Sequence, residues 1–136
     1  MAYPIPGTPR LIAPSNVCPY YAKDAPRAVT KRELQTIIRQ FGDAASRVQL
    51  AGGDGVEIHA AHAHGLPGGF LSPLYNKRSD EYGGDINGRL RLTLEIISEV
   101  RTRCGEDFII DVRLRPEWTP SRSTVTGCWV PCVPNC

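Results

Sequence analysis

Residues 55–64 read Gly-Val-Glu-Ile-His-Ala-Ala-His-Ala-His, and this stretch decides how the rest of the chain is interpreted. Its first five residues are partly β-branched and follow glycines, which predicts a strand entering a buried parallel sheet. All three histidines of the chain, His59, His62 and His64, fall within six residues at the C-terminal end of that strand. In a barrel of parallel strands that end faces the active site, where histidine can donate a hydrogen bond, transfer a proton or bind a metal. The alternative is a polar loop with incidental histidines.

A helical pattern precedes this strand and another follows it. Thr30 and Glu33 form a T-x-x-E capping box, which predicts a first helix over about residues 31–50. Its apolar residues at helical spacing are Leu34, Ile37, Ile38, Phe41, Ala45 and Val48. A second helix is predicted over roughly residues 86–103 and ends at Gly105. Its apolar residues are Leu90, Leu94, Ile97 and Val100.

Residues 108–114, which read Phe-Ile-Ile-Asp-Val-Arg-Leu, predict a second strand. The order helix, strand, loop, helix, strand contains no hairpin signal, so it indicates an α/β protein with parallel strands. Two such strands with helices on one side only would leave much apolar surface in water. The pattern therefore indicates that further elements of the sheet are missing.

Three segments show no regular pattern. Six prolines within residues 1–29 remove backbone donors, which predicts an extended loop with no regular helix or central strand. Residues 60–85 are glycine-rich and charged, and they predict a loop long enough to be functional. Residues 121–136 lack acidic residues and periodicity. We therefore divide the chain into residues 1–120, which carry the α/β pattern, and an irregular tail that need not be native.

The composition is that of a water-soluble globular protein, with 41% hydrophobic and 22% charged residues. No apolar run approaches the roughly 18 residues of a membrane span, and the start lacks a signal-peptide pattern, so we expect a cytoplasmic location. A net charge of +2 gives no one-sign field that would attract nucleic acid or anionic membranes. Five cysteines, three of them in the last nine residues, make a poor disulfide framework and match no usual zinc spacing. Cys18 and Cys104 are predicted to be reduced thiols.

Four motifs then occur in an order that is highly specific. They are V-E-I-H-A-A-H at residues 56–62, F-L-S-P-x-x-N-x-R-x-D-E-Y-G-G at residues 70–84, Arg89, and F-I-I-D-V-R-L at residues 108–114. Together they closely resemble the NADH:flavin oxidoreductase family named after old yellow enzyme, over about residues 7–119. The resemblance implies a TIM (β/α)8 barrel that holds FMN at the C-terminal ends of its strands. This chain would supply about two βα units and an N-terminal proline-rich loop.

The resemblance also implies roles for individual residues. It implies hydride transfer from flavin N5 to an activated alkene or a related acceptor, with NADH or NADPH as the electron donor. By position, His59 and His62 match the pair that hydrogen-bonds the substrate's electron-withdrawing oxygen, where two donors would stabilise an enolate-like transition state. Arg113 matches the strand-borne arginine near flavin N1 and O2, where a fixed guanidinium would favour the anionic reduced flavin.

The chain departs from the commonest family pattern just after His62. Many relatives have Gly-Tyr there, and the tyrosine delivers a proton to the substrate carbon, whereas this chain has Ala63-His64-Gly65. His64 is therefore a candidate for the proton donor. The spacing from His59 to Phe70 is most similar to the trimethylamine dehydrogenase branch, which extends the expected substrates to amines. That branch and the dienoyl-CoA reductase branch carry an iron–sulfur cluster, but the C-x2-C-x3-C motif of the cluster is absent from this chain.

The charged loop after Phe70 is interpreted as architectural rather than catalytic. Gly83-Gly84 permits a tight turn, and charges of both signs can pair to order the loop. The loop residues concerned are Asn76, Arg78, Asp80, Glu81, Tyr82 and Arg89. Glu57 and Asp111 each precede a candidate site residue by two, so on a strand they share its face. Whether either carboxylate pairs with Arg113 is open at this point.

Two other functions are compatible with these residues. A zinc-dependent barrel hydrolase would use the H-x-H of His62 and His64, but the other motifs have no place in such an enzyme. The chain could also be a non-catalytic product of a truncated or frame-shifted gene. Because too few barrel strands and no late phosphate-binding loops are recognisable, we expect the chain alone neither to retain FMN nor to reduce an alkene. The expected partner is a small-molecule substrate, and the sequence indicates no oligomeric state.

Overall fold

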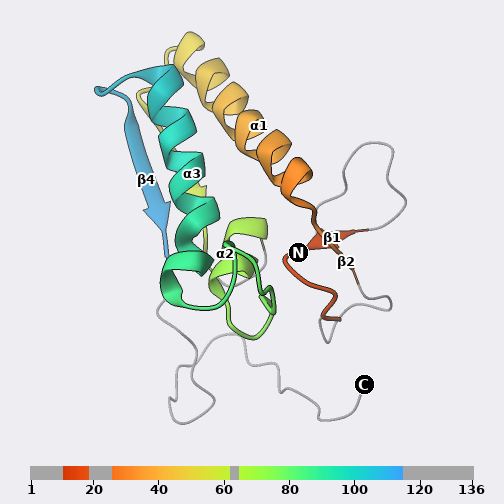
Figure 1. Ribbon diagram of the computed structural model, residues 1–136. Coiled ribbons are helices and arrows are strands. Elements are labelled where there is room, and N and C mark those ends of the chain that lie inside the picture. The colour runs from red at the N-terminus through yellow and green to blue at the C-terminus, as the bar shows by residue number, and fades with distance from the viewer. Residues whose placement is uncertain (1–10, 19–25, 62–64, 115–136) are drawn as a thin grey trace, which may run out of the picture.

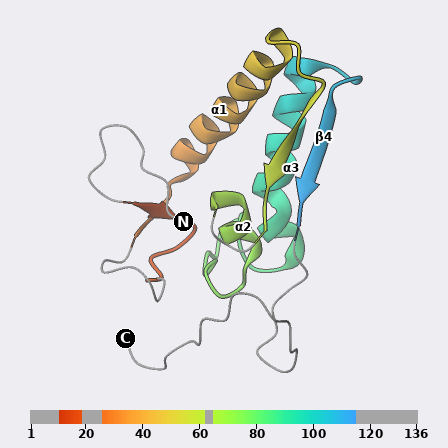
Figure 2. The same ribbon diagram turned by 180° about the vertical axis from the view of Figure 1, so that it is seen from behind.

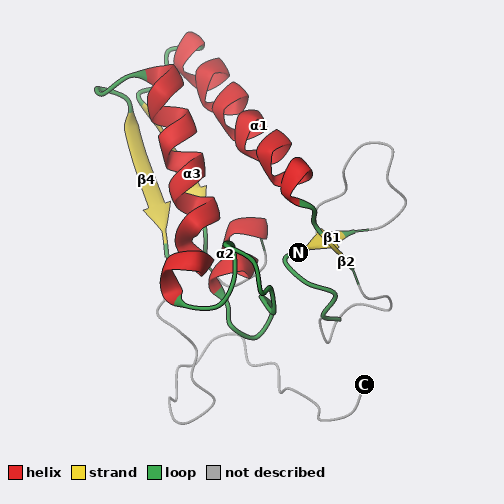
Figure 3. Ribbon diagram, viewed as in Figure 1, coloured by secondary structure: helices red, strands yellow, loops and turns green. Residues whose placement is uncertain are grey.

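The computed structural model describes residues 11–18, 26–61 and 65–114, and within them the helices and strands follow the predicted order with three short additions. In chain order the elements are β1 (Ile12–Ala13), β2 (Arg27–Ala28), α1 (Lys31–Leu50), β3 (Gly55–His59), α2 (Leu66–Leu71), α3 (Ile86–Cys104) and β4 (Ile109–Arg113). The additions are β1, β2 and α2. The long helices α1 and α3 lie side by side and cover one face of the β3–β4 pair (Figures 1 and 3). This arrangement confirms the α/β prediction.

Helix α1 begins and ends close to the predicted positions. The Thr30 hydroxyl accepts a hydrogen bond from the Glu33 backbone N–H, and the Glu33 carboxylate accepts one from the Thr30 backbone N–H. The capping box is therefore complete. Beyond the last helical residue, Gly52 adopts a φ of 86°, a conformation that favours glycine and ends the helix. The buried side chains that α1 contributes to the core include Leu34, Ile38 and Ala45.

Helix α3 has clear caps, and its buried face includes only some of the apolar residues that predicted the helix. The Asp85 carboxylate accepts a hydrogen bond from the Gly88 backbone N–H at the start, and Gly105 with a φ of 82° follows the end. Val100 of the predicted pattern is buried, whereas Leu94 is 56% exposed. The buried residues of α3 are Leu92, Thr93, Ile96, Val100 and Cys104. The helix carries apolar residues on two adjacent faces, so periodicity alone could not identify the face that meets α1 and the sheet.

Strands β3 and β4 form a parallel pair, as predicted, with Gly55 opposite Ile109 at one end and His59 opposite Arg113 at the other. Because successive side chains of a strand alternate between faces, one face of the pair is apolar. This face packs against the helices, and its side chains are Val56, Ile58, Ile110 and Val112. The core therefore lies between the sheet and the two long helices.

The opposite face of the pair is turned toward the viewer in Figure 2, and within the described ranges no helix covers it. It carries the side chains of Glu57, His59, Asp111 and Arg113, and Ile109 at its N-terminal end is 62% exposed. The sequence predicted much apolar surface in water for such a pair, and on this face the exposed apolar side chain among the described residues is Ile109. The face is polar and charged, because the candidate site residues and the carboxylates beneath them occupy the outward positions of both strands.

The N-terminal region is not wholly the extended loop that its prolines predict. Strands β1 and β2 pair in parallel, and the Arg27 N–H donates to the Leu11 carbonyl at 2.9 Å. The side chains of Ile12 and Val29 are buried in the same core as the helices. Each strand has only two residues, which is too short to leave a periodic signal.

Helix α2 lies within the segment that was predicted as one long loop. Pro67 stands in its first turn, where proline is favoured, but two central glycines lower its helix propensity and hide it from sequence patterns. A Cβ atom on Gly68 would lie 3.0 Å from the carbonyl oxygens of Ala60 and Ala61. Glycine thus allows α2 to pack directly against the chain that leaves β3.

Candidate active site

The C-terminal end of the strand pair carries the two predicted site residues that the structure describes. His59 is the last residue of β3 and Arg113 is the last residue of β4, and the two are partners in the register. The Ala60 backbone N–H donates to the Arg113 carbonyl at 3.0 Å, so the pairing continues one residue beyond β3. The parallel arrangement has therefore brought together two residues that are far apart in the sequence.

One residue pair below, Glu57 and Asp111 are opposite each other on the same face. The Arg113 side chain extends from β4 toward β3, and its Nη1 atom lies 3.9 Å from Glu57 Oε1. The pairing that the sequence left open is thus made by Glu57. The Arg113 and Glu57 side chains are 60% and 49% exposed, and an exposed pair at this distance contributes little to stability.

His62 and His64 lie outside the described residues, so their predicted roles remain predictions. The segment that carries them is short, since Ala61 precedes it and Gly65, the N-cap of α2, follows it. Ala60 and Ala61 are both buried, which fixes the chain at the point where it leaves β3.

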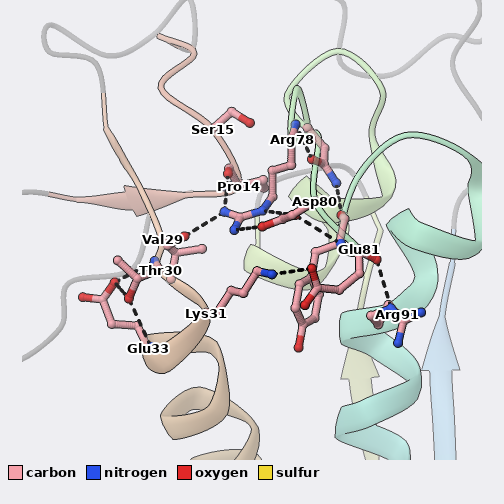
Figure 4. Close-up of polar contacts among 12 residues, drawn as sticks. Pro14, Ser15, Val29, Thr30, Lys31, Glu33, Arg78, Asp80, Glu81 and Arg91 are labelled. Atoms are coloured by element: carbon pink, nitrogen blue, oxygen red, sulfur yellow. Dashed lines mark hydrogen bonds and ion pairs between the residues drawn. The ribbon is translucent and has the colours of Figure 1, made fainter.

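Arg78 joins the charged loop to the N-terminal strands (Figure 4). Its Nε and Nη2 atoms bind both oxygens of the Asp80 carboxylate at 2.9 and 2.6 Å, and its Nη1 donates to the carbonyls of Pro14 and Val29. The guanidinium carbon also lies 5.8 Å from the centre of the Phe70 ring. The hydrogen bonds from Arg78 lower the pKa of the Asp80 carboxyl below its usual value. With these contacts made, Arg78 holds the fold together, as the architectural interpretation predicts.

Asn76 fixes the start of the same loop from inside the protein. Its side chain is 5% exposed, and its Nδ2 donates to the carbonyls of Phe70 and Tyr82, both at 2.8 Å. Its Oδ1 accepts a hydrogen bond from the Arg78 backbone N–H at 3.1 Å. A buried amide that makes these three bonds orders the loop at a point where backbone groups would otherwise be unpaired.

Tyr82 connects the loop to both long helices. Its hydroxyl donates to Glu95 Oε2 of α3 at 2.7 Å and accepts from Gln35 Nε2 of α1 at 3.2 Å. Burial, followed by the hydrogen bond to the Glu95 carboxylate, raises the pKa of Tyr82 to about 12. Lys31 of α1 makes a second link, an ion pair with Glu81 at 2.5 Å. Sequence reasoning missed Gln35, Lys31 and Glu95, because no local spacing rule links residues so far apart.

Within the described ranges, no group of three histidine, cysteine, aspartate or glutamate side chains is placed to hold a metal ion. The His62 to His64 segment, on which a zinc site would depend, lies outside those ranges. The described helices include none that is long and apolar enough to cross a membrane. Cys104 is a buried free thiol, as predicted.

The chain is similar in sequence to a known family of proteins. The model of the NADH:flavin oxidoreductase / NADH oxidase family matches residues 10–125. The chain belongs to this family. Among its curated relatives, the NADH oxidase of Thermoanaerobacter brockii is 43% identical over 102 residues, which cover 75% of this chain and 16% of that protein. A multifunctional alkene reductase/demethylase of Caballeronia cordobensis is 39% identical over 116 residues, which cover 85% of this chain and 17% of that protein.

The family assignment also explains the arrangement of the elements. The structure of morphinone reductase matches this chain with a TM-score of 0.72 and 32% sequence identity, over 80% of this chain and 33% of that one. The described elements therefore correspond to part of the TIM barrel of the family, with β3 and β4 as neighbouring barrel strands and α1 and α3 on the outside. The open polar face of β3 and β4 is the inner face of that barrel. The chain spans about one sixth of the length of the two curated relatives.

Proposed function

We propose that this segment forms part of the active site of an FMN-dependent oxidoreductase that takes electrons from NADH or NADPH and reduces an activated alkene or a related acceptor. The observation that carries the proposal is the pairing of His59 with Arg113 at the C-terminal ends of two parallel strands, on the face that the helices leave open. In β/α barrels this end of the strands holds the active site. The family match supports the same assignment.

The side chains on this face fit a flavin. Arg113 presents a planar, permanently charged guanidinium with several N–H donors, which suits the edge of a ring that becomes negatively charged on reduction. Its side chain is 60% exposed on the inner face, so it is accessible to a bound ring. Bound FMN would supply the hydride chemistry, and Arg113 would hold the ring and favour its reduced form.

His59 and His62 would bind the substrate. Two N–H donors directed at a carbonyl oxygen stabilise the negative charge that accumulates there when a hydride is added to the conjugated carbon. The strand register fixes His59, and the two residues that follow it, Ala60 and Ala61, are buried. His64 is proposed to hold the proton that the substrate carbon receives, at the position where many relatives have a tyrosine.

The substrate class follows from these residues and from the family. A hydrogen-bonding pair at the reacting end favours small molecules in which a carbonyl or similar group activates an alkene. The names of the relatives, an NADH oxidase and an alkene reductase/demethylase, support a nicotinamide donor together with alkene reduction and demethylation. Amine substrates are the second class, because the length of the loop after His59 is similar to that of the trimethylamine dehydrogenase branch.

The test uses the FMN-loaded protein that contains this segment, with His59 and His62 both changed to alanine. Phenols imitate the oxygen that this pair would bind, so we expect phenol affinity and alkene reduction to fall by about 100-fold or more while FMN stays bound. His64→Ala is the matched control in the same loop, and it should slow reduction but leave phenol affinity unchanged. Undiminished phenol affinity in the double variant would rule out the assigned role of the pair.

A further inference from the structure

The inner face of β3 and β4 has two layers of charged side chains at its C-terminal end. The upper layer holds His59 and Arg113, and the lower layer holds Glu57 and Asp111. Only one of the two carboxylates reaches the arginine. Glu57 lies on the neighbouring strand and its Oε1 is 3.9 Å from Arg113 Nη1. Among the described residues no ion pair to Asp111 is found, although Asp111 is on the same strand and the same face as Arg113.

The contact brings the guanidinium sideways, from its own strand toward Glu57 on β3. Stability does not explain why a glutamate stands there, because both side chains are half-exposed or more and such a pair contributes little to folding. The pair would interact more strongly when a bound ring removes water from it, because the effective dielectric constant falls. The attraction between Arg113 and Glu57 should therefore be stronger when a ligand occupies the site.

We propose that Glu57 is a positioning residue for Arg113, which holds the guanidinium toward β3 and offsets part of its positive charge. This inference rests on the proposed function, in which Arg113 lies beside the flavin. A cation at the flavin stabilises the reduced anion, and a carboxylate that offsets this cation makes reduction harder. Loss of the Glu57 charge should therefore raise the midpoint potential of the flavin.

The experiment measures the two-electron midpoint potential of bound FMN in the protein that contains this segment, by redox titration followed in the visible spectrum. We expect Glu57→Gln to favour reduced flavin about tenfold, which corresponds to about 30 mV for a two-electron couple. Asp111→Asn is the matched control, since it removes the same charge from the same layer without removing the contact. Its shift should be clearly smaller. Glu57→Asp keeps the charge but shortens the side chain, and its potential should lie between those of the wild type and Glu57→Gln.

A double-mutant cycle tests whether Glu57 acts through the arginine. In an Arg113→Lys background the contact is already altered, so adding Glu57→Gln should shift the potential by much less than it does in the wild type. Equal shifts in both backgrounds would show that Glu57 acts only as a distant charge, which overturns the positioning role. If Glu57→Gln fails to fold, the shift in midpoint potential caused by Glu57→Asp is measured in the wild-type and Arg113→Lys backgrounds instead. Equal shifts would again overturn the positioning role.

The outcomes also separate this inference from the proposed function. A protein that binds no FMN in its wild-type form contradicts the proposed function itself. A protein that binds FMN, but whose potential changes equally in Glu57→Gln and Asp111→Asn, leaves the proposed function intact and contradicts the special role of Glu57.

Discussion

Two regions of the molecule are rich in charge, and they use it in opposite ways. In the charged loop over residues 76–85, Arg78 is 11% exposed and makes four hydrogen bonds to a carboxylate and two carbonyls. On the inner face of β3 and β4, the arginine is 60% exposed and its ion pair is 3.9 Å long. Four hydrogen bonds therefore hold Arg78, whereas Arg113 makes a longer ion pair with Glu57.

This difference distinguishes structural charge from functional charge within one segment. A buried charge has to be paired locally, because leaving it unpaired costs several kcal/mol. A charge that binds a ligand has to keep hydrogen-bonding capacity for that ligand. Arg78 fits the first description and Arg113 the second. The distinction predicts that substitutions in the loop affect folding, whereas substitutions on the strand face affect the ligand.

The largest expected effect on stability comes from Arg78. Arg78→Ala removes the donors to the Pro14 and Val29 carbonyls and leaves the Asp80 carboxylate without its cation. We expect the free energy of unfolding, measured by urea denaturation, to fall by about 3 kcal/mol, at the lower end of the effect of breaking a buried pair. Arg91→Ala is the control, since Arg91 donates to the Glu81 carbonyl from an exposed position. If both variants lost the same stability, the loop would not depend on Arg78 as described.

Local patterns predicted most of this fold. The capping box placed the start of α1, the glycines placed the ends of both long helices, and the parallel pairing followed from the order of the elements. The helix α2 was missed because its glycines and proline are loop signals, and its packing against Ala60 and Ala61 is what makes it a helix. Leu94 fits the helical spacing and is nevertheless exposed, because its neighbours in space, not its spacing, determine its burial.

The positions of His59 and Arg113 at strand ends were predictable from the sequence, but the contact that Arg113 makes was not. The motif placed His59 and Arg113 at strand ends, and the register then made them partners. The choice of Glu57 over Asp111 as the partner of Arg113 depends on the direction of a flexible side chain across two strands. The links from Lys31 and Gln35 to the loop likewise join residues that only the packing of α1 brings together. Such contacts depend on tertiary geometry, and a single sequence does not specify it.

A smaller effect on stability is expected from the capping box in acid. Hydrogen bonds from Arg27, and then from Thr30, lower the pKa of Glu33 from its usual 4.5 to about 2. Because the folded pKa is the lower one, this contribution is fully present above pH 4.5 and is lost as the pH falls to about 2. After allowance for solvent screening of a partly exposed pair, we expect about 1 kcal/mol of stability to disappear across this interval.

Glu33→Gln keeps a side chain that can complete the capping box but removes the charge, so unfolding measured between pH 5 and about pH 2 should show a correspondingly flatter acid limb. Arg27→Gln should flatten the limb almost as much, because the hydrogen bond from Arg27 is the largest cause of the lowered pKa. An unchanged acid limb in Arg27→Gln would contradict this attribution.

Arg113 is expected to contribute least to stability, although the contrast with Arg78 predicts that it contributes most to flavin binding. Arg113→Ala removes the half-exposed ion pair with Glu57. Among the described residues it removes no buried hydrogen bond of the Arg113 side chain. The free energy of unfolding without flavin should therefore change by less than about 0.5 kcal/mol. In the FMN-loaded protein the same substitution should weaken FMN binding at least tenfold, measured by fluorescence titration, because the ring loses its permanently charged donor. Arg78→Ala should show the reverse pattern, with a large loss of stability and, in the folded fraction, little change in flavin affinity. A variant of Arg113 that unfolds as readily as the Arg78 variant would show that the strand-face arginine is structural after all, and that exposure in this segment does not separate the two kinds of charge.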